Sequence, residues 1–104
     1  MKLVPINNYD NDHEFYRGTV IREFEIGLNV SNSDEDYYDY MLVNDPSDNE
    51  YFILVNISFK NGKAGALRTH IKYKKNTMFT TKNEIIKMLN SKNIYIVEDF
   101  ALKI

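Results

Sequence analysis

One short segment combines carboxylates and tyrosines at a density that suits binding to a basic partner. Tyrosine supplies rigid contact area at a small entropic cost, and carboxylates attract cations over a distance. Carboxylates at this spacing can also imitate the phosphates held in the cleft of a basic nuclease. The competing interpretation is a solvated turn with one or two tyrosines in the core. We predict a partner-binding surface made of Asp34, Glu35, Asp36, Tyr37, Tyr38, Asp39 and Tyr40, which Asp45, Asp48 and Glu50 extend if the chain folds back there.

A second cluster has the opposite charge. It comprises Arg68, His70, Lys72, Lys74 and Lys75, on the second strand of a predicted hairpin. Such a cluster can bind nucleic-acid phosphates, and a histidine can move the 2′-hydroxyl proton in a ribonuclease. That chemistry generally requires a second acid or base, and the other histidine, His13, is far along the sequence. A nucleic-acid-binding module or small ribonuclease is therefore the alternative function.

The remaining polar motifs do not match a known catalytic or metal site. Asp10, Asp12 and Glu14 have the alternate spacing of a calcium loop, but the glycine at the sixth position and the distal glutamate are missing. His13 lies between carboxylates in a polar loop, where charged neighbours are usually solvated. The chain has no cysteine, and it lacks a phosphate loop, a nucleophile elbow and a zinc-helix motif. We predict no catalytic residue, no metal and no cofactor, and therefore no enzyme.

The net charge of −2 conceals two oppositely charged halves. Residues 1–50 contain 12 acidic and three basic residues, a net charge of −9, whereas residues 51–104 have a net charge of +7. One interpretation is that the halves lie side by side and neutralise each other across strand pairs. The other is that one sign is displayed on a face for a charged partner. The strand order decides between them.

Length and composition indicate a single globular domain over residues 1–104. A chain of 104 residues with 43% hydrophobic and 27% charged residues has room for one modest core. The longest apolar run, residues 51–55, is too short to span a bilayer, and the N-terminus lacks the apolar region of a signal peptide. We therefore expect a bacterial cytoplasmic protein.

Most of the chain has the pattern of β-strands. Residues 19–30 alternate, with Val20, Phe24 and Ile26 on one face and polar residues on the other, while Arg22 interrupts the apolar face. Short strands are also expected near residues 3–6 and 94–97. Residues 34–43 fit either a capped helix or a loop followed by a strand, and we favour a strand over 38–43 because its side chains favour β structure.

A hairpin is predicted around Asn61 and Gly62, between residues 51–59 and 64–74. A two-residue turn would place Ile53 opposite His70. A three-residue loop with a bulge would instead pair Val55 with Leu67, Ile53 with Thr69 and Tyr51 with Ile71. We choose the second register because it keeps one face apolar. It places Val55 and Leu67 on the buried face, and the basic side chains beside Phe52 and Leu54.

The predicted helix covers about residues 82–91. Thr81 and Glu84 form a capping-box pattern, and apolar residues follow at helical spacing. The order of elements predicts an α+β fold with a single antiparallel-dominated sheet of about five strands and one C-terminal helix packed on one face.

The chain resembles the small cytoplasmic bacterial immunity proteins of polymorphic and contact-dependent growth inhibition toxin systems. The resemblance rests on its size, on the absence of cysteine, and on the acidic, tyrosine-bearing segment 34–40 with Asp45, Asp48 and Glu50. The resemblance covers about a quarter of the chain and includes no family-defining motif. It implies a non-enzymatic inhibitor that binds and neutralises a cognate toxin, often a nuclease domain, through an acidic–aromatic surface. A phage-encoded inhibitor of a nucleic-acid-binding host protein would have the same features.

Overall fold

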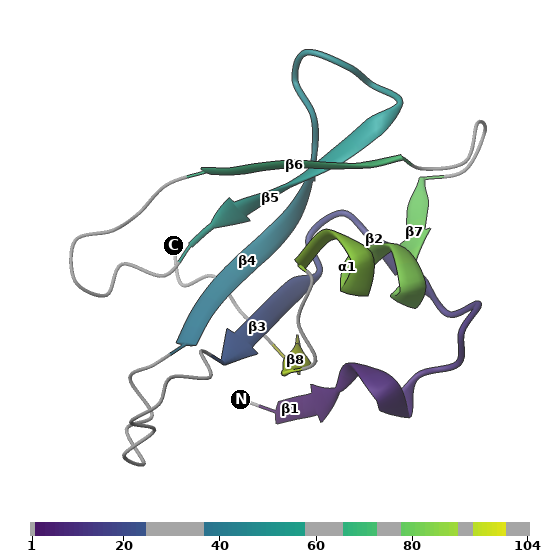
Figure 1. The fold of residues 1–104 in the computed structure, drawn as a ribbon, viewed down its shortest axis with the longest axis vertical. Helices are drawn as coiled ribbons and strands as arrows, with labels where there is room; N and C mark the ends of the chain where they lie inside the picture. Colours follow the sequence, from purple (N-terminus) through teal and green to yellow (C-terminus); the bar gives the residue numbers. More distant parts are fainter. Residues whose placement is uncertain (1, 25–36, 58–65, 73–77, 90–92, 100–104) are drawn as a thin grey trace.

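The computed structural model describes residues 2–24, 37–57, 78–89 and 93–99, and the backbone of residues 66–72. Figure 1 shows the course of the chain. In chain order the elements are β1 (Lys2–Pro5), the 3-10 helix η1 (Ile6–Asn8), β2 (Glu14–Tyr16), β3 (Val20–Phe24), β4 (Tyr37–Asn44), β5 (Tyr51–Asn56), β6 (Ala66–Lys72), β7 (Phe79–Thr81), α1 (Lys82–Leu89) and β8 (Ile94–Glu98).

The strands form two antiparallel sheets. The larger sheet has six strands in the order β1-β8-β3-β4-β5-β6, and β2 pairs with β7 in a separate two-stranded sheet. The predicted α+β class is confirmed, and α1 is the single α-helix of the described residues. The strand order is not sequential, because the last strand, β8, lies between β1 and β3. Segments from the two ends of the chain are therefore neighbours at one side of the sheet.

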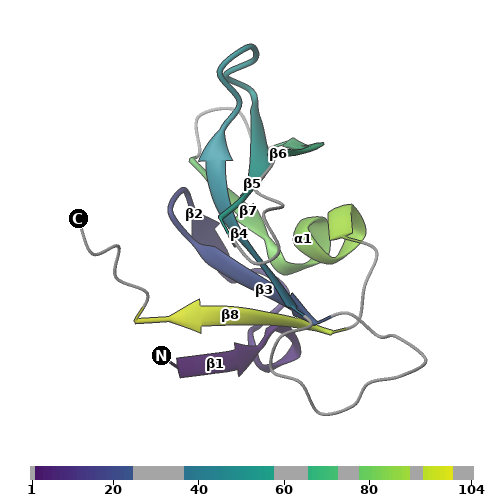
Figure 2. The same ribbon diagram turned by 90° about the vertical axis from the view of Figure 1, so that its left-hand side faces the viewer.

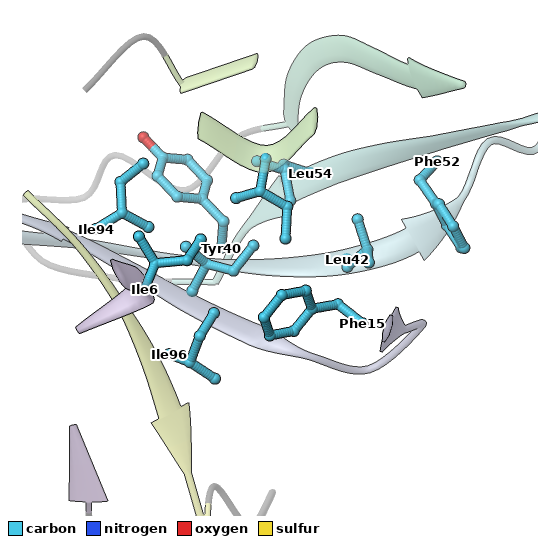
Figure 3. Close-up of a cluster of buried hydrophobic side chains, with 10 residues drawn as sticks. Ile6, Phe15, Tyr40, Leu42, Phe52, Leu54, Ile94 and Ile96 are labelled. Atoms are coloured by element: carbon cyan, nitrogen blue, oxygen red, sulfur yellow. The ribbon is translucent and has the colours of Figure 1, made fainter. Parts of the chain in front are cut away.

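The core lies between one face of the six-stranded sheet, α1 and the two-stranded sheet. Figure 3 shows the cluster, to which β3, β4, β5 and β8 contribute alternate residues. Leu42, Phe52 and Leu54 are fully buried there, and the helix adds Ile85. Figure 2 shows α1 on one side of the sheet. We call the opposite side, which has no helix among the described residues, the helix-free face.

Helix α1 begins directly after Thr81, where the capping-box pattern predicted it. Glu84 lies in its first turn and Lys87 in its last, which suits the helix dipole at both ends. Ile85 is buried, while Ile86, Met88 and Leu89 pack against the core. Beyond Leu89, the predicted helix end falls outside the described residues.

The predicted register of the β5–β6 hairpin is wrong. Ile53 pairs with His70 and Tyr51 with Lys72, and the register shifts between Ile53 and Leu54 so that Leu54 pairs with Leu67. The assignment of faces is also wrong for β5. Phe52 and Leu54 enter the core, whereas Val55 is half-buried. Alternation distinguishes two faces, but here both faces of β5 are apolar, so the pattern alone cannot identify the core side. The predicted turn at Asn61 and Gly62 falls outside the described residues.

The link from β2 to β3 depends on a glycine. Gly18 has a φ of 92°, a backbone conformation that residues with a side chain rarely adopt. Its N–H donates to the Leu42 carbonyl at 2.7 Å. The Leu42 N–H in turn donates to the Thr19 carbonyl at 2.9 Å. These two bonds attach the start of β3, and with it the two-stranded sheet, to the centre of β4.

Within the described ranges, no helix has the length and hydrophobicity needed to cross a membrane.

Candidate protein-binding surface

Strand β4 separates the residues of the predicted acidic–aromatic segment. Tyr38 and Tyr40 point to the core side, where Tyr40 is 8% exposed and its ring lies among core side chains (Figure 3). Tyr37 and Asp39 lie on the helix-free face, because side chains alternate along a strand. Asp34, Glu35 and Asp36 fall outside the described residues. The described part of the segment is therefore not one continuous exposed patch.

Asp39 is not an exposed carboxylate, contrary to the sequence prediction. It is 8% exposed and pairs with Arg22 on the adjacent strand β3. Arg22 donates from Nε to Oδ1 at 2.7 Å and from Nη2 to Oδ2 at 2.9 Å, so the ion pair is bidentate. The hydrogen bond to Asp39 raises the pKa of Arg22. Each charge thus neutralises the other within the sheet.

Three aromatic rings lie on the same face of the sheet as this ion pair. The Arg22 guanidinium carbon lies 3.8 Å from the centre of the Tyr37 ring, a cation–π contact. The Phe24 ring lies 5.9 Å from that of Tyr37 and 5.2 Å from that of Tyr95, which it meets edge to face at 87°. We call Arg22, Phe24, Tyr37, Asp39 and Tyr95 the aromatic–arginine cluster. Strands β3, β4 and β8 each contribute to it.

Apolar side chains continue the surface beyond the cluster. Met41 pairs with Val55 and Val43 with Ile53, and all four are half-buried. Val20 pairs with Met41 and is itself buried. The helix-free face is thus apolar across β3, β4 and β5, and its central charges are paired with one another. A face of this kind can lose its water without leaving an unpaired charge.

The structure does not bring Asp45, Asp48 and Glu50 beside the cluster. They lie in the turn after β4, whereas Tyr37 begins that strand, about 23 Å away along eight residues. Asp45 is 6% exposed and accepts hydrogen bonds from the Ser47 N–H and hydroxyl, so it stabilises the turn. Asp48 and Glu50 are exposed.

The alternative nucleic-acid cluster lies at one edge of the sheet. Arg68, His70 and Lys72 belong to β6, the outermost strand beyond β5. Arg68 falls within the register shift, while His70 and Lys72 are in register with Ile53 and Tyr51. Lys74 and Lys75 lie outside the described residues.

His13 and its surroundings form a second polar cluster. Its ring contacts those of Tyr9 and Phe15, each at 4.7 Å. The Tyr9 hydroxyl donates to Glu98 Oε2 at 2.5 Å, and this bond, with help from Lys2 at 3.5 Å, lowers the pKa of Glu98. Burial and the same bond raise the pKa of Tyr9. The cluster joins the residues before β2 to the end of β8.

The two charged halves do not neutralise each other in the registers of the strand pairs that join them. Those pairs are β1–β8, β2–β7, β3–β8 and β4–β5, and in their registers the charged residues that face each other are Lys2 and Glu98. The ion pairs Arg22–Asp39 and Lys2–Glu98 occupy two of the three basic residues of the acidic half. In these registers, no acidic residue of the first half faces a basic residue of the second.

Sequence reasoning missed Phe24 and Tyr95 as site residues. The signal that was present is Arg22, a charged residue on the alternating apolar face of its strand. A charge at such a position needs a partner, and Asp39 in the acidic segment supplies it. Tyr95 could not be found in this way, because the β3–β8 pairing is remote in sequence.

No protein-family model, curated protein or solved structure matches the chain. Among the described residues, no group of three or more histidine, aspartate or glutamate side chains is placed to hold a metal ion.

Proposed function

We propose that this protein is a non-enzymatic inhibitor that binds and neutralises a basic protein target, such as a nuclease toxin domain, in the bacterial cytoplasm. The observation that carries the proposal is the aromatic–arginine cluster on the helix-free face. Aromatic residues and arginine dominate the binding energy of protein interfaces when they form a packed centre.

The contacts within the cluster support a preorganised binding surface. The Arg22 guanidinium contacts the Tyr37 ring, and the Phe24 ring contacts those of Tyr37 and Tyr95, so these side chains lose little conformational freedom when a partner docks. The half-buried side chains of Met41, Val43, Ile53 and Val55 on the same face supply apolar area that binding can dehydrate.

Charge supports a basic target. The net charge of −9 in residues 1–50 attracts cations, and in the registers of the strand pairs that join the halves no acidic residue of the first half faces a basic residue of the second. In this proposal, the acidic charge accelerates association, whereas the aromatic–arginine cluster slows dissociation.

The test compares two neighbouring tyrosines on opposite faces of β4. The chain is used as bait in its native host, and each captured protein is purified and assayed for binding kinetics and for loss of its own activity. Tyr37→Ala and Tyr95→Ala should raise the dissociation rate constant about 30-fold, the equivalent of about 2 kcal/mol. Tyr38→Ala, on the core side, should lower stability but leave dissociation from the folded protein unchanged.

Two outcomes would count against the proposal. If Tyr37→Ala and Tyr95→Ala leave dissociation unchanged, the helix-free face is not the interface. If the chain itself binds or cleaves RNA, with binding that weakens steeply as salt rises, the nucleic-acid alternative on β6 would be favoured.

A further inference from the structure

The outer face of the two-stranded sheet is a second exposed surface. Phe15 and Thr80 point inward from it and are buried, so their neighbours in β2 and β7 point outward. Tyr16 on this face is 51% exposed, an unusual value for a large side chain with apolar area among the described residues. Figures 1 and 2 both separate β2 and β7 from the end of β3 and the start of β4, where the aromatic–arginine cluster lies.

The side chains of this outer face are arranged in a row. Tyr16 is in register with Phe79, and their ring centres lie 6.1 Å apart in an edge-to-face contact. Beside this pair, the Tyr16 hydroxyl donates to Glu14 Oε1, which holds the carboxylate beside the ring. A carboxylate has more acceptor sites than this one bond uses.

Charges of both signs flank this face. On the β2 side, Asp10, Asp12 and Glu14 are exposed, and the exposed Arg17 is the basic residue within 10–17, so this stretch has a net charge of −2. On the β7 side, Lys82 follows Thr81, the register partner of Glu14, but its Nζ donates to the Tyr9 carbonyl at 3.0 Å. An aromatic face next to a carboxylate suits a lysine or arginine side chain, whose stem can lie across the rings while its charge meets the carboxylate.

We propose that this outer face, formed by Glu14, Tyr16 and Phe79, binds a basic segment of a protein partner. A lysine or arginine of that segment lies across Tyr16 and Phe79 with its charge on Glu14. The surface is separate from the aromatic–arginine cluster, and this inference does not depend on the proposed function.

The test titrates the isotope-labelled full chain with a blocked pentapeptide of sequence Gly-Arg-Leu-Arg-Gly, followed by amide NMR. Saturable shifts are expected at residues 14–17 and 78–81. Glu14→Gln and Tyr16→Ala should each weaken binding about fivefold, whereas Tyr16→Phe, which keeps the ring, should weaken it less. The side chains are exposed, and unchanged amide spectra elsewhere would show that each variant is folded.

The matched control is Glu50→Gln, which removes the same charge from the remote turn after β4. It should change the affinity less than twofold, a factor equivalent to about 0.4 kcal/mol. The peptide Gly-Glu-Leu-Glu-Gly should not bind. The proposal is overturned if the shifts map elsewhere, if Glu50→Gln weakens binding as much as Glu14→Gln, or if the acidic peptide binds equally well.

Discussion

Arg22 links the two kinds of interaction that organise the helix-free face. It forms a bidentate ion pair with Asp39 and at the same time covers the ring of Tyr37. The side chains of the ion pair are only 12% and 11% exposed, so water screens their attraction weakly. At the residue scale, the site therefore depends on a charge pair that is built into the sheet.

Removing one member of this pair should destabilise the fold. Asp39→Asn leaves the Arg22 charge largely buried without its counter-ion, and we expect a loss of about 3 kcal/mol in the free energy of unfolding, measured with urea. Asp48→Asn, at an exposed position, is the control and should change stability by less than about 0.5 kcal/mol. Adding Arg22→Met to Asp39→Asn should recover part of the loss, because the unpaired charge is then gone. Equal effects at Asp39 and Asp48 would contradict the buried ion pair.

The Tyr9–Glu98 bond should be visible in a titration. Because it lowers the pKa of the Glu98 carboxyl, the folded state binds this proton less readily than the unfolded state. Its stabilising contribution is therefore complete above the ordinary pKa and is lost as the pH falls through the lowered value. In Tyr9→Phe, NMR titration should show the Glu98 pKa moving up toward normal. An unchanged pKa in this variant, with a shift in Lys2→Met instead, would assign the effect to the ion pair with Lys2.

The element that differs most from expectation is the β5–β6 hairpin. Both faces of β5 carry apolar residues, and the structure selects the one containing Phe52 and Leu54 for the core. The register shift passes over Arg68 and Thr69, so it places Leu67 opposite Leu54. A helix and a small sheet cover the selected face, which leaves Val55 half-buried on the other.

Two truncations on β5 discriminate between these assignments. Phe52→Ala removes a fully buried ring and should lower the free energy of unfolding by about 3–5 kcal/mol. Val55→Ala should have a clearly smaller effect, since its side chain is only partly removed from water. Chemical denaturation of both variants provides the measurement. A larger loss for Val55→Ala than for Phe52→Ala would instead support the assignment of faces expected from the sequence.

At the scale of the whole molecule, the charge distribution and the proposed interfaces have separate roles. The aromatic–arginine cluster has no net charge, because Arg22 and Asp39 form an ion pair. Exposed acidic residues such as Asp48 and Glu50 lie away from it. Steering depends on the summed field, so these acids can accelerate an encounter without touching the partner. Affinity and association rate should accordingly respond to different substitutions.

Kinetics with a purified target of the proposed function can test this separation. Raising NaCl from about 50 to about 500 mM shortens the screening length and should slow association, with a small effect on dissociation. The double variant Asp48→Asn, Glu50→Gln should slow association at low salt only. Tyr37→Ala should mainly change dissociation. Salt-independent association would remove electrostatic steering from the proposal.

Several local features could be predicted from the sequence because neighbouring residues determine them. A capping-box pattern indicates the helix start after Thr81, and turn-forming residues indicate the turn at Asp45. The β propensity of residues 94–97 indicates the strand there. The strand over residues 38–43 was also correctly favoured over a helix. The short strands β2 and β7 were missed, since three residues are too few for a periodic pattern.

The sequence by itself determined an α+β chain with alternating strands, one helix and an uneven distribution of charge. Only the tertiary structure decided which apolar face became the core, and that β8 would insert between β1 and β3. The physical reason is that strand pairing joins residues remote in sequence. The alternation of apolar and polar side chains repeats every two residues and does not specify which strands will be neighbours in the sheet. Hence Asp39 could be read as an exposed carboxylate, although the fold places it against Arg22, and Tyr95 joins Phe24 only through β8.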